Sequence, residues 1–357
     1  MGWFTGGGHG YLSSTYGMGA DNLLEATIIT PNGDVVTANA CSHTELFFAI
    51  RGGGGGTYGV VIEAVMRAYP SPKPAIHNLQ VGSKNSSMSS EYWELMAYIH
   101  SELPRLKNGG MQGYYSMVGP PLAPTLSLLW SFYLYDKPNG TAEALFAPIA
   151  ARLNNASSYF IYKASVDTAS NFYDAYLTTA SNEPVATGGS AYGSRLLPER
   201  ALVDMALVAK TFENIGPSPN ISKPSVCHDS PIILPLVSSG TRGFFCGAVH
   251  LLLSYNISFR ILIIIRQGVF FNTLLLGHLV ANSGNRGLDI GMNPAWRDAV
   301  VHFVIWERWV DGMSQTLIDN VYNDITFNKT YALKQLAPDG GAYFNEVCPL
   351  PRLWPSL

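Results

Sequence analysis

Two glycine-rich runs and one histidine are the residues of this sequence whose types and spacing indicate chemistry. The first run, "GGGHG", spans residues 6–10 and contains His9, and the second spans residues 52–56. Glycine lets backbone N–H groups approach a bulky charged ligand and lets the chain pass beneath a planar ring. We expect His9 to be a loop histidine with a local hydrogen bond; the alternative is a catalytic group, because imidazole is a common proton acceptor and donor. Taken alone, each run favours tight turns at a sheet edge, with a ligand-binding wall as the alternative.

The second run contains the letters of the dinucleotide fingerprint, as Gly54-x-Gly56-x-x-Gly59. That fingerprint follows a strand and opens a helix whose N-terminus meets the pyrophosphate. Here "TELFFAI" predicts a helix before the glycines, and "VVIEAVM" predicts a strand after them. Neither run ends in the Gly-Lys-Ser/Thr of a phosphate loop. We therefore expect neither a nicotinamide dehydrogenase nor an NTPase.

The elements around these runs follow from local patterns. Residues 22–38 predict a hairpin that turns at residues 31–34, "PNGD", because Asn-Gly tolerates the positive φ of a tight turn. Ser42 and Glu45 form a capping box ahead of an apolar run and predict a helix start. Arg51 ends this helix, where a cation is favoured; we expect it to cap the helix rather than to bind a phosphate.

The remainder alternates between helical and strand patterns. The prolines of residues 71–74 mark a boundary between domains. Helical spacing of apolar residues and strand-like runs predict an α+β domain, an antiparallel sheet covered by helices on one face. The expected helices span residues 89–106, 139–154, 198–214 and 311–328, and the expected strands include 125–135 and 157–165. Trp296 and Trp306 are expected in the core or the sheet.

Composition excludes several classes of function. The chain has 357 residues, of which 47% are hydrophobic and 13% charged, and its net charge is −3, without a basic patch. A globular protein of two domains is expected, with no nucleic-acid partner. The longest apolar stretch is interrupted by Arg260, Arg266 and Gln267, so no membrane span is expected. The four cysteines show no CxxC and no zinc-type spacing, and no metal site is expected.

Asparagine-linked glycosylation motifs are frequent and favour a secreted glycoprotein. They lie at Asn85, Asn139, Asn155, Asn220, Asn256 and Asn328.

The ordered string from Gly2 to Pro70 resembles the second half of the FAD-binding domain of PCMH-type (vanillyl-alcohol oxidase-like) flavoproteins, in particular the berberine bridge enzyme-like oxidases. The block 46–59, "LFFAIRGGGGGTYG", is especially specific. The resemblance returns at "NPAWRDAVVHFVI" and at "AYFNE", which is similar to the family's C-terminal flavin-contacting motif. It implies three parts: residues 1–72 as the second FAD-binding subdomain, 73–330 as an α+β substrate domain, and 331–357 as a partial C-terminal segment.

The resemblance also implies site residues and chemistry. The wall around the flavin ring and ribityl chain would comprise Gly6, Gly7, Gly8, His9, Gly10, Leu12, Ser13, Gly17 and Asp21. Backbone contacts near the adenine would come from Gly59, Val60 and Val61. Tyr343, beside Asn345 at the ring, would take the hydroxyl proton of an alcohol, sugar or secondary metabolite, its pKa lowered from about 10, as a hydride passes to flavin N5. Molecular oxygen would reoxidise the flavin.

The sequence departs from the family's pattern at both ends and once in the middle. The first FAD-binding subdomain, with its flavin-linking histidine, and the second attachment cysteine have no counterpart, so we expect an N-terminally truncated chain. Residues 217–267 are unlike the family and are interpreted as a translated intron or a wrongly joined exon. After Glu346 the chain reads "VCPLPRLWPSL" without the expected ending. The alternative function is a catalytically inactive binding or interaction protein that retains only the substrate domain.

Overall fold

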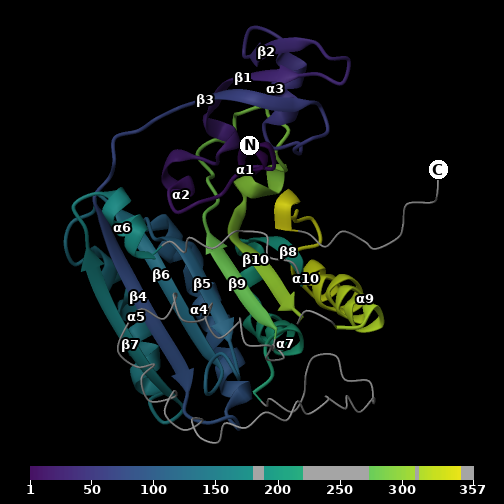
Figure 1. The fold of residues 1–357 in the computed structure, drawn as a ribbon. Helices are drawn as coiled ribbons and strands as arrows, with labels where there is room; N and C mark the ends of the chain where they lie inside the picture. Colours follow the sequence, from purple (N-terminus) through teal and green to yellow (C-terminus); the bar gives the residue numbers. More distant parts are fainter. Residues whose placement is uncertain (180–188, 220–272, 310–312, 347–357) are drawn as a thin grey trace, which may run out of the picture.

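Two antiparallel sheets organise the chain. The computed structural model describes residues 1–179, 189–219, 273–309 and 313–346. A three-stranded sheet lies at one end, and a seven-stranded sheet with helices on one face forms the body (Figure 1). The α+β class with an antiparallel, helix-covered sheet is confirmed.

The small sheet has the order β2-β1-β3 and comes from the first seventy residues. Its strands are β1 (Leu23–Ile29), β2 (Val35–Asn39) and β3 (Val60–Met66), and helix α3 (Thr44–Ile50) packs on it. The hairpin predicted around Asn-Gly is confirmed, since β1 and β2 pair around that turn and Gly33 has φ +90°. The helix before the second glycine run and the strand after it are also confirmed.

One local prediction around α3 is wrong. The helix begins after His43, without a side-chain cap, because Asn39 Oδ1 accepts from the N–H groups of Cys41 and Ser42 and holds them in a turn. Arg51 is the C-cap residue of the helix, as expected, and its backbone N–H donates to the carbonyl of Phe48. Its side chain points elsewhere: Nε donates to the carbonyl of Ala20 at 2.9 Å, which ties α3 to the first glycine-rich loop.

The main sheet has the order β7-β4-β6-β5-β9-β10-β8, and every neighbouring pair is antiparallel. Its strands are β4 (Pro74–Ser83), β5 (Gln112–Val118), β6 (Ser127–Tyr135), β7 (Phe160–Thr168), β8 (Ser190–Pro198), β9 (Leu274–Leu279) and β10 (Ala299–Arg308). The strands β5, β9 and β10 lie side by side at its centre, although more than 150 residues separate β5 from β9 in sequence.

Helices α4 (Ser89–Asn108), α5 (Thr141–Asn155) and α7 (Met205–Ile215) cover one face of this sheet, and the largest hydrophobic cluster lies between them and the strands. The expected helix over 198–214 is divided into a 3₁₀ turn, Glu199–Leu202, and α7, because Asp204 caps the N-terminus of α7 by accepting from Leu207 N–H. The expected last helix is α9 (Gln315–Asn323), continued by a π-helix (Asp324–Lys329) and α10 (Thr330–Leu336).

The first twenty-two residues pack against the other face of the main sheet. They form two short helices, α1 (Gly2–Thr5) and α2 (Ser13–Tyr16), and the loops beside them, with α6 (Phe172–Thr179) nearby (Figure 1). Tyr135 of β6 donates a hydrogen bond to the carbonyl of Tyr11 at 3.0 Å. On the other side of the loop, Arg297 makes a bidentate ion pair with Asp21, at 2.7 and 2.9 Å. These contacts fix the first glycine-rich loop against the sheet.

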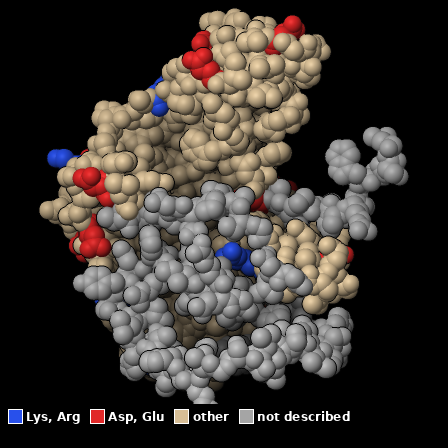
Figure 2. Space-filling view, viewed as in Figure 1, with Lys and Arg blue, Asp and Glu red and all other residues tan. Residues whose placement is uncertain are grey.

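The described residues also test the expectations about membrane spans, surface charge and buried tryptophans. Among the described helices, none has both the length and the apolarity that crossing a bilayer requires. On the face shown in Figure 2, charged side chains are widely separated over the described surface. Trp296 is 1% exposed, which confirms its core position. Residues 217–267, interpreted above as a translated intron or a wrongly joined exon, lie almost wholly outside the described residues. Three of the four cysteines, Cys227, Cys246 and Cys348, lie outside them as well.

Candidate active site

Three polar side chains form a row across the centre of the main sheet. In the register of the sheet, His278 of β9 lies opposite Tyr114 of β5 on one side and His302 of β10 on the other. Side chains alternate between faces along a strand, so the three share one face. The neighbouring Tyr115 and Phe303 point to the opposite face, into the helix-covered core. The row therefore faces the glycine-rich loop.

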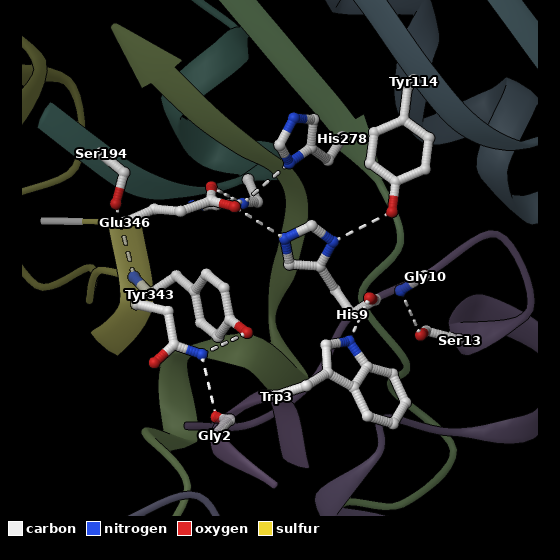
Figure 3. Close-up of polar contacts among 12 residues, drawn as sticks. Gly2, Trp3, His9, Gly10, Ser13, Tyr114, Ser194, His278, Tyr343 and Glu346 are labelled. Atoms are coloured by element: carbon white, nitrogen blue, oxygen red, sulfur yellow. Dashed lines mark hydrogen bonds and ion pairs between the residues drawn. The ribbon is translucent and has the colours of Figure 1, made fainter. Parts of the chain in front are cut away.

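The loop adds His9 to this row (Figure 3). The Tyr114 hydroxyl lies 3.0 Å from His9 Nδ1, and a Glu346 carboxylate oxygen lies 3.2 Å from His9 Nε2. Because a carboxylate only accepts, Nε2 carries the proton and Nδ1 accepts from the tyrosine. Trp3 Nε1 donates to the carbonyl of His9 at 2.9 Å and holds the loop in this position. His9 thus has a fixed orientation and a defined tautomer.

The electrostatics of the row follow from its burial. Burial lowers the pKa of His302 to about 3, and it lowers the pKa of His278 well below the usual value. The two Nδ1 atoms are 3.0 Å apart, so one ring donates to the other. Burial would raise the pKa of Glu346, but the hydrogen bond from His9 and the neighbouring imidazoles outweigh it and lower the pKa. Burial raises the pKa of Tyr114, which keeps its proton.

A cavity of about 640 Å³ lies beside this group. Its wall is largely aromatic, and the row contributes His9 and Tyr114 to it. The aromatic residues that line it are Trp3, Tyr11, Tyr16, Tyr69, Tyr114, Phe172 and Tyr176. Its volume lies within the range of small-molecule sites. His9 therefore joins an open, mainly apolar cavity to a buried carboxylate.

The residues expected in the flavin wall divide into three groups. One group lines the cavity and comprises His9, Gly10, Leu12, Ser13 and Gly17. A second group, Gly6, Gly7 and Gly8, packs against protein side chains instead. A Cβ on Gly6 would lie 2.4 Å from the Asn345 amide, and one on Gly8 would lie 3.0 Å from the Trp3 indole. The bare backbone of this second group accommodates these side chains.

The third group lies away from the cavity. The carboxylate of Asp21, 1% exposed, is engaged by Arg297, by Asn285 and by the N–H of Met18. Asp21 therefore joins the glycine-rich loop to the segment before β10. Gly59, Val60 and Val61 lie at the start of β3 and its pairing with β1, and they are not among the residues that line the cavity.

Tyr343 and Asn345, which the resemblance placed beside the flavin ring, pack against Gly7 and Gly6 of the glycine-rich loop. Asn345 Nδ2 donates to the Tyr343 hydroxyl at 2.8 Å and to the carbonyl of Gly2 at 3.2 Å (Figure 3). The expected lowering of the Tyr343 pKa is wrong. Burial raises it, and the nearby charge of Glu346 adds to the rise, although the hydrogen bonds from Asn345 and Gly8 lower it in part.

Four residues of this group had no role in the sequence analysis: Tyr114, His278, His302 and Glu346. A signal was present for the two strand histidines. Each interrupts a strongly apolar strand, "LLLGHLV" and "AVVHFVIW", and a buried histidine needs partners. Glu346 ends the motif "AYFNE", which the sequence analysis singled out without giving this carboxylate a role. Tyr114 carries no comparable local signal.

Comparison with known proteins gives consistent relatives. No family model matches the chain. It is 27% identical to an uncharacterised FAD-linked oxidoreductase of Arthroderma benhamiae over 97% of its own length and 52% of the relative. It is 35% identical to the FAD-linked oxidoreductase apf9 of Gibberella fujikuroi over 56% of its length and 36% of the relative.

The fold has a solved counterpart. The VAO-type flavoprotein MtVAO713 of Myceliophthora thermophila superposes on 97% of the chain and 54% of its own, with a TM-score of 0.77 and 25% identity. The chain spans about half, or less, of the length of the proteins it matches.

Proposed function

Since the chain belongs to the vanillyl-alcohol oxidase-like (PCMH-type) superfamily of FAD-linked oxidoreductases, we propose that it acts in the FAD-dependent oxidation of a small molecule that carries an alcohol group. The observation that carries the proposal is the position of His9. It lies in the glycine-rich loop, lines an aromatic cavity and contacts a buried carboxylate.

The residues around the cavity fit a flavin. Flavin rings are planar and carry polar edges, so they need flat apolar walls and hydrogen-bond donors. The cavity has aromatic walls, and a Cβ on Gly10 would meet only Ser13 Oγ, at 4.0 Å. Within the described residues, the backbone N–H groups of Tyr11 and Leu12 have no hydrogen-bond acceptor.

These loop residues would hold the cofactor. Tyr343 and Asn345, which the resemblance places at the flavin ring, pack against Gly7 and Gly6 and are not among the residues that line the cavity. FAD, when bound, supplies the redox chemistry, accepting a hydride at N5 and passing the electrons to O₂ as hydrogen peroxide.

The protein's own residues would move the hydroxyl proton of the substrate. Tyr114 lines the cavity and donates to His9 Nδ1, so a substrate hydroxyl at Tyr114 gives its proton to the phenol oxygen as the phenol proton passes to His9. Glu346 stabilises the resulting imidazolium across the 3.2 Å contact with Nε2. The carbon–hydrogen bond then breaks with its electron pair, and the carbonyl product forms. This relay uses a tyrosine that keeps its proton in the resting state.

Tyr343 remains the alternative proton acceptor. The family resemblance supports it, and its hydroxyl already receives hydrogen bonds from Asn345 and Gly8, as a phenolate would. One observation favours Tyr114 and His9: both line the cavity, whereas Tyr343 is 3% exposed and does not line it. Burial raises the pKa of both tyrosines, so their pKa values do not distinguish them.

The test measures bound flavin and its reduction. The purified full chain is assayed for FAD by its visible absorbance, and bleaching is followed without oxygen after addition of alcohols, sugars and phenolic alcohols. We expect His9→Gln and Tyr114→Phe to slow bleaching by roughly 100-fold, the usual contribution of a proton acceptor. His77→Gln is the control, because His77 lies on β4 and pairs with Trp130.

The outcomes distinguish the two candidate proton acceptors, and an oxidoreductase from a binding protein. Slow bleaching in Tyr343→Phe alone assigns the proton to Tyr343. Colourless protein that still binds a sugar or phenol supports the binding protein and overturns the oxidoreductase.

Secretion and glycosylation are part of the proposal. The four glycosylation motifs within the described residues all have exposed asparagines: Asn85, Asn139, Asn155 and Asn328. Glycosidase treatment of chain secreted from a eukaryotic host should increase its mobility on a gel. Unchanged mobility would contradict glycosylation.

A further inference from the structure

Three histidines and one carboxylate converge from four separate parts of the chain. His278 comes from β9, His302 from β10, His9 from the glycine-rich loop, and Glu346 from the 3₁₀ turn Phe344–Glu346. One nitrogen or oxygen of each residue lies within 4.8 Å of those of the other three. Both strand histidines are buried, and the side chains of His9 and Glu346 are only 11% and 26% exposed.

The cluster is not satisfied by its own hydrogen bonds. Glu346 Oε1 is bonded to His9, but Oε2 is buried and has no hydrogen-bond partner among the described residues. His302 Nδ1 lies 3.7 Å from Oε2. That atom already shares the one proton between the two strand histidines. A buried carboxylate oxygen beside imidazole lone pairs requires a positive partner.

We propose that His9, His278, His302 and Glu346 form a binding site for a divalent transition-metal cation of the Zn²⁺ type. Imidazole nitrogens and a carboxylate oxygen are the ligands that such cations take in proteins. Metal–ligand bonds of 2.0–2.2 Å in tetrahedral geometry separate neighbouring ligand atoms by about 3.4 Å. Three contacts, of 3.0, 3.2 and 3.7 Å, bracket this value, although the last two involve different oxygens of Glu346. All four ligand atoms lie within 4.8 Å of one another, so coordination would require the side chains to move closer together.

The second layer of contacts also suits a metal. Coordination through His9 Nε2 places the imidazole proton on Nδ1, which then donates to the Tyr114 oxygen at 3.0 Å. A ligating histidine usually donates its other N–H in this way, and such a partner fixes the ring. The site would join the glycine-rich loop, the sheet and the 3₁₀ turn Phe344–Glu346. This inference does not depend on the proposed oxidoreductase function.

The experiment titrates the full chain, stripped with a chelator, with Co²⁺. Tetrahedral Co²⁺ gives intense visible absorption, so we expect a spectrum that saturates at one equivalent and disappears on addition of Zn²⁺. Glu346→Gln and His278→Asn should weaken Co²⁺ binding by at least about tenfold. His77→Gln should bind as the unmodified chain does, and circular dichroism checks that each variant is folded.

The outcomes decide between a metal site and a network of hydrogen bonds. No saturable tetrahedral spectrum in the unmodified chain overturns the site, as does equal affinity in Glu346→Gln. Bound FAD is measured on the same samples. Colourless protein that binds Co²⁺ supports the metal site and contradicts the oxidoreductase, and yellow protein that binds none does the reverse.

Discussion

Replacement of Asp21 by asparagine tests the ion pair that joins the glycine-rich loop to the segment before β10. The side chains of Asp21 and Arg297 are 1% and 9% exposed, and their two hydrogen bonds measure 2.7 and 2.9 Å. Asn keeps the shape of Asp but leaves the buried guanidinium without an anion. Removing one partner of a buried pair typically costs about 3–5 kcal/mol.

The expected shift in melting temperature follows from chain length. The entropy of unfolding grows with the number of residues, so for 357 residues a loss of 1 kcal/mol lowers the melting temperature by about 1–2 °C. Asp21→Asn should therefore lower it by roughly 5 °C, measured by differential scanning calorimetry.

The matched control is Asp298→Asn. Asp298 pairs with Arg286, and both side chains are more than half exposed. A surface pair of this kind contributes about 0–1 kcal/mol, because water screens both charges. Equal melting temperatures for Asp21→Asn and Asp298→Asn would refute the reasoning. A double variant, Asp21→Asn with Arg297→Met, should cost less than the sum of the single changes, because it leaves no unpaired buried charge.

Three further measurements test the loop and the cluster. Burial alone would raise the pKa of Asp21, but its hydrogen bonds and Arg297 outweigh this effect and lower the pKa. The contribution of Asp21 to the free energy of unfolding is therefore complete above its unfolded pKa, near 4, and is lost as the pH falls through its folded pKa. In chemical denaturation at several pH values, the free energy of unfolding of Asp21→Asn should fall less steeply towards acid pH than that of the unmodified chain. Gly6→Ala places a Cβ 2.4 Å from the Asn345 amide and should cost about 1–3 kcal/mol by thermal melting, whereas Gly2→Ala, with open space around it, should cost little. If both proposals hold, one equivalent of Zn²⁺ slows anaerobic flavin bleaching by roughly 100-fold, because the proton moved to Nδ1 of His9 removes the acceptor that faces Tyr114; unchanged rates in protein shown to hold Zn²⁺ would contradict the relay.

Local patterns predicted the elements that depend on neighbours in sequence. Asn32-Gly33 identified the turn between β1 and β2, because only residues tolerant of positive φ fit there. Apolar spacing identified α4 and α5. The capping box of α3 failed because Asn39 Oδ1 accepts from the Ser42 N–H, which the Glu45 side chain would accept from in a capping box. Local rules fail where two such signals overlap.

The family resemblance pointed to the glycine-rich loop as a site, and five of its expected wall residues line the cavity. What the loop meets could not be found in this way. His278 and His302 face it only because β9 and β10 pair in a register that places them opposite each other. Glu346 reaches His9 across 337 positions of sequence. Asp21 looked like a ligand contact, yet Arg297, 276 positions away, takes its carboxylate.

The sequence by itself therefore determined most of the local elements, because turn residues and apolar periodicity act over a few residues, and its resemblance to PCMH-type flavoproteins pointed to the glycine-rich loop as the candidate site. The tertiary structure alone decided which titratable groups share that site. Their proximity and their pKa values come from strand register and burial, which depend on contacts between residues far apart in the chain.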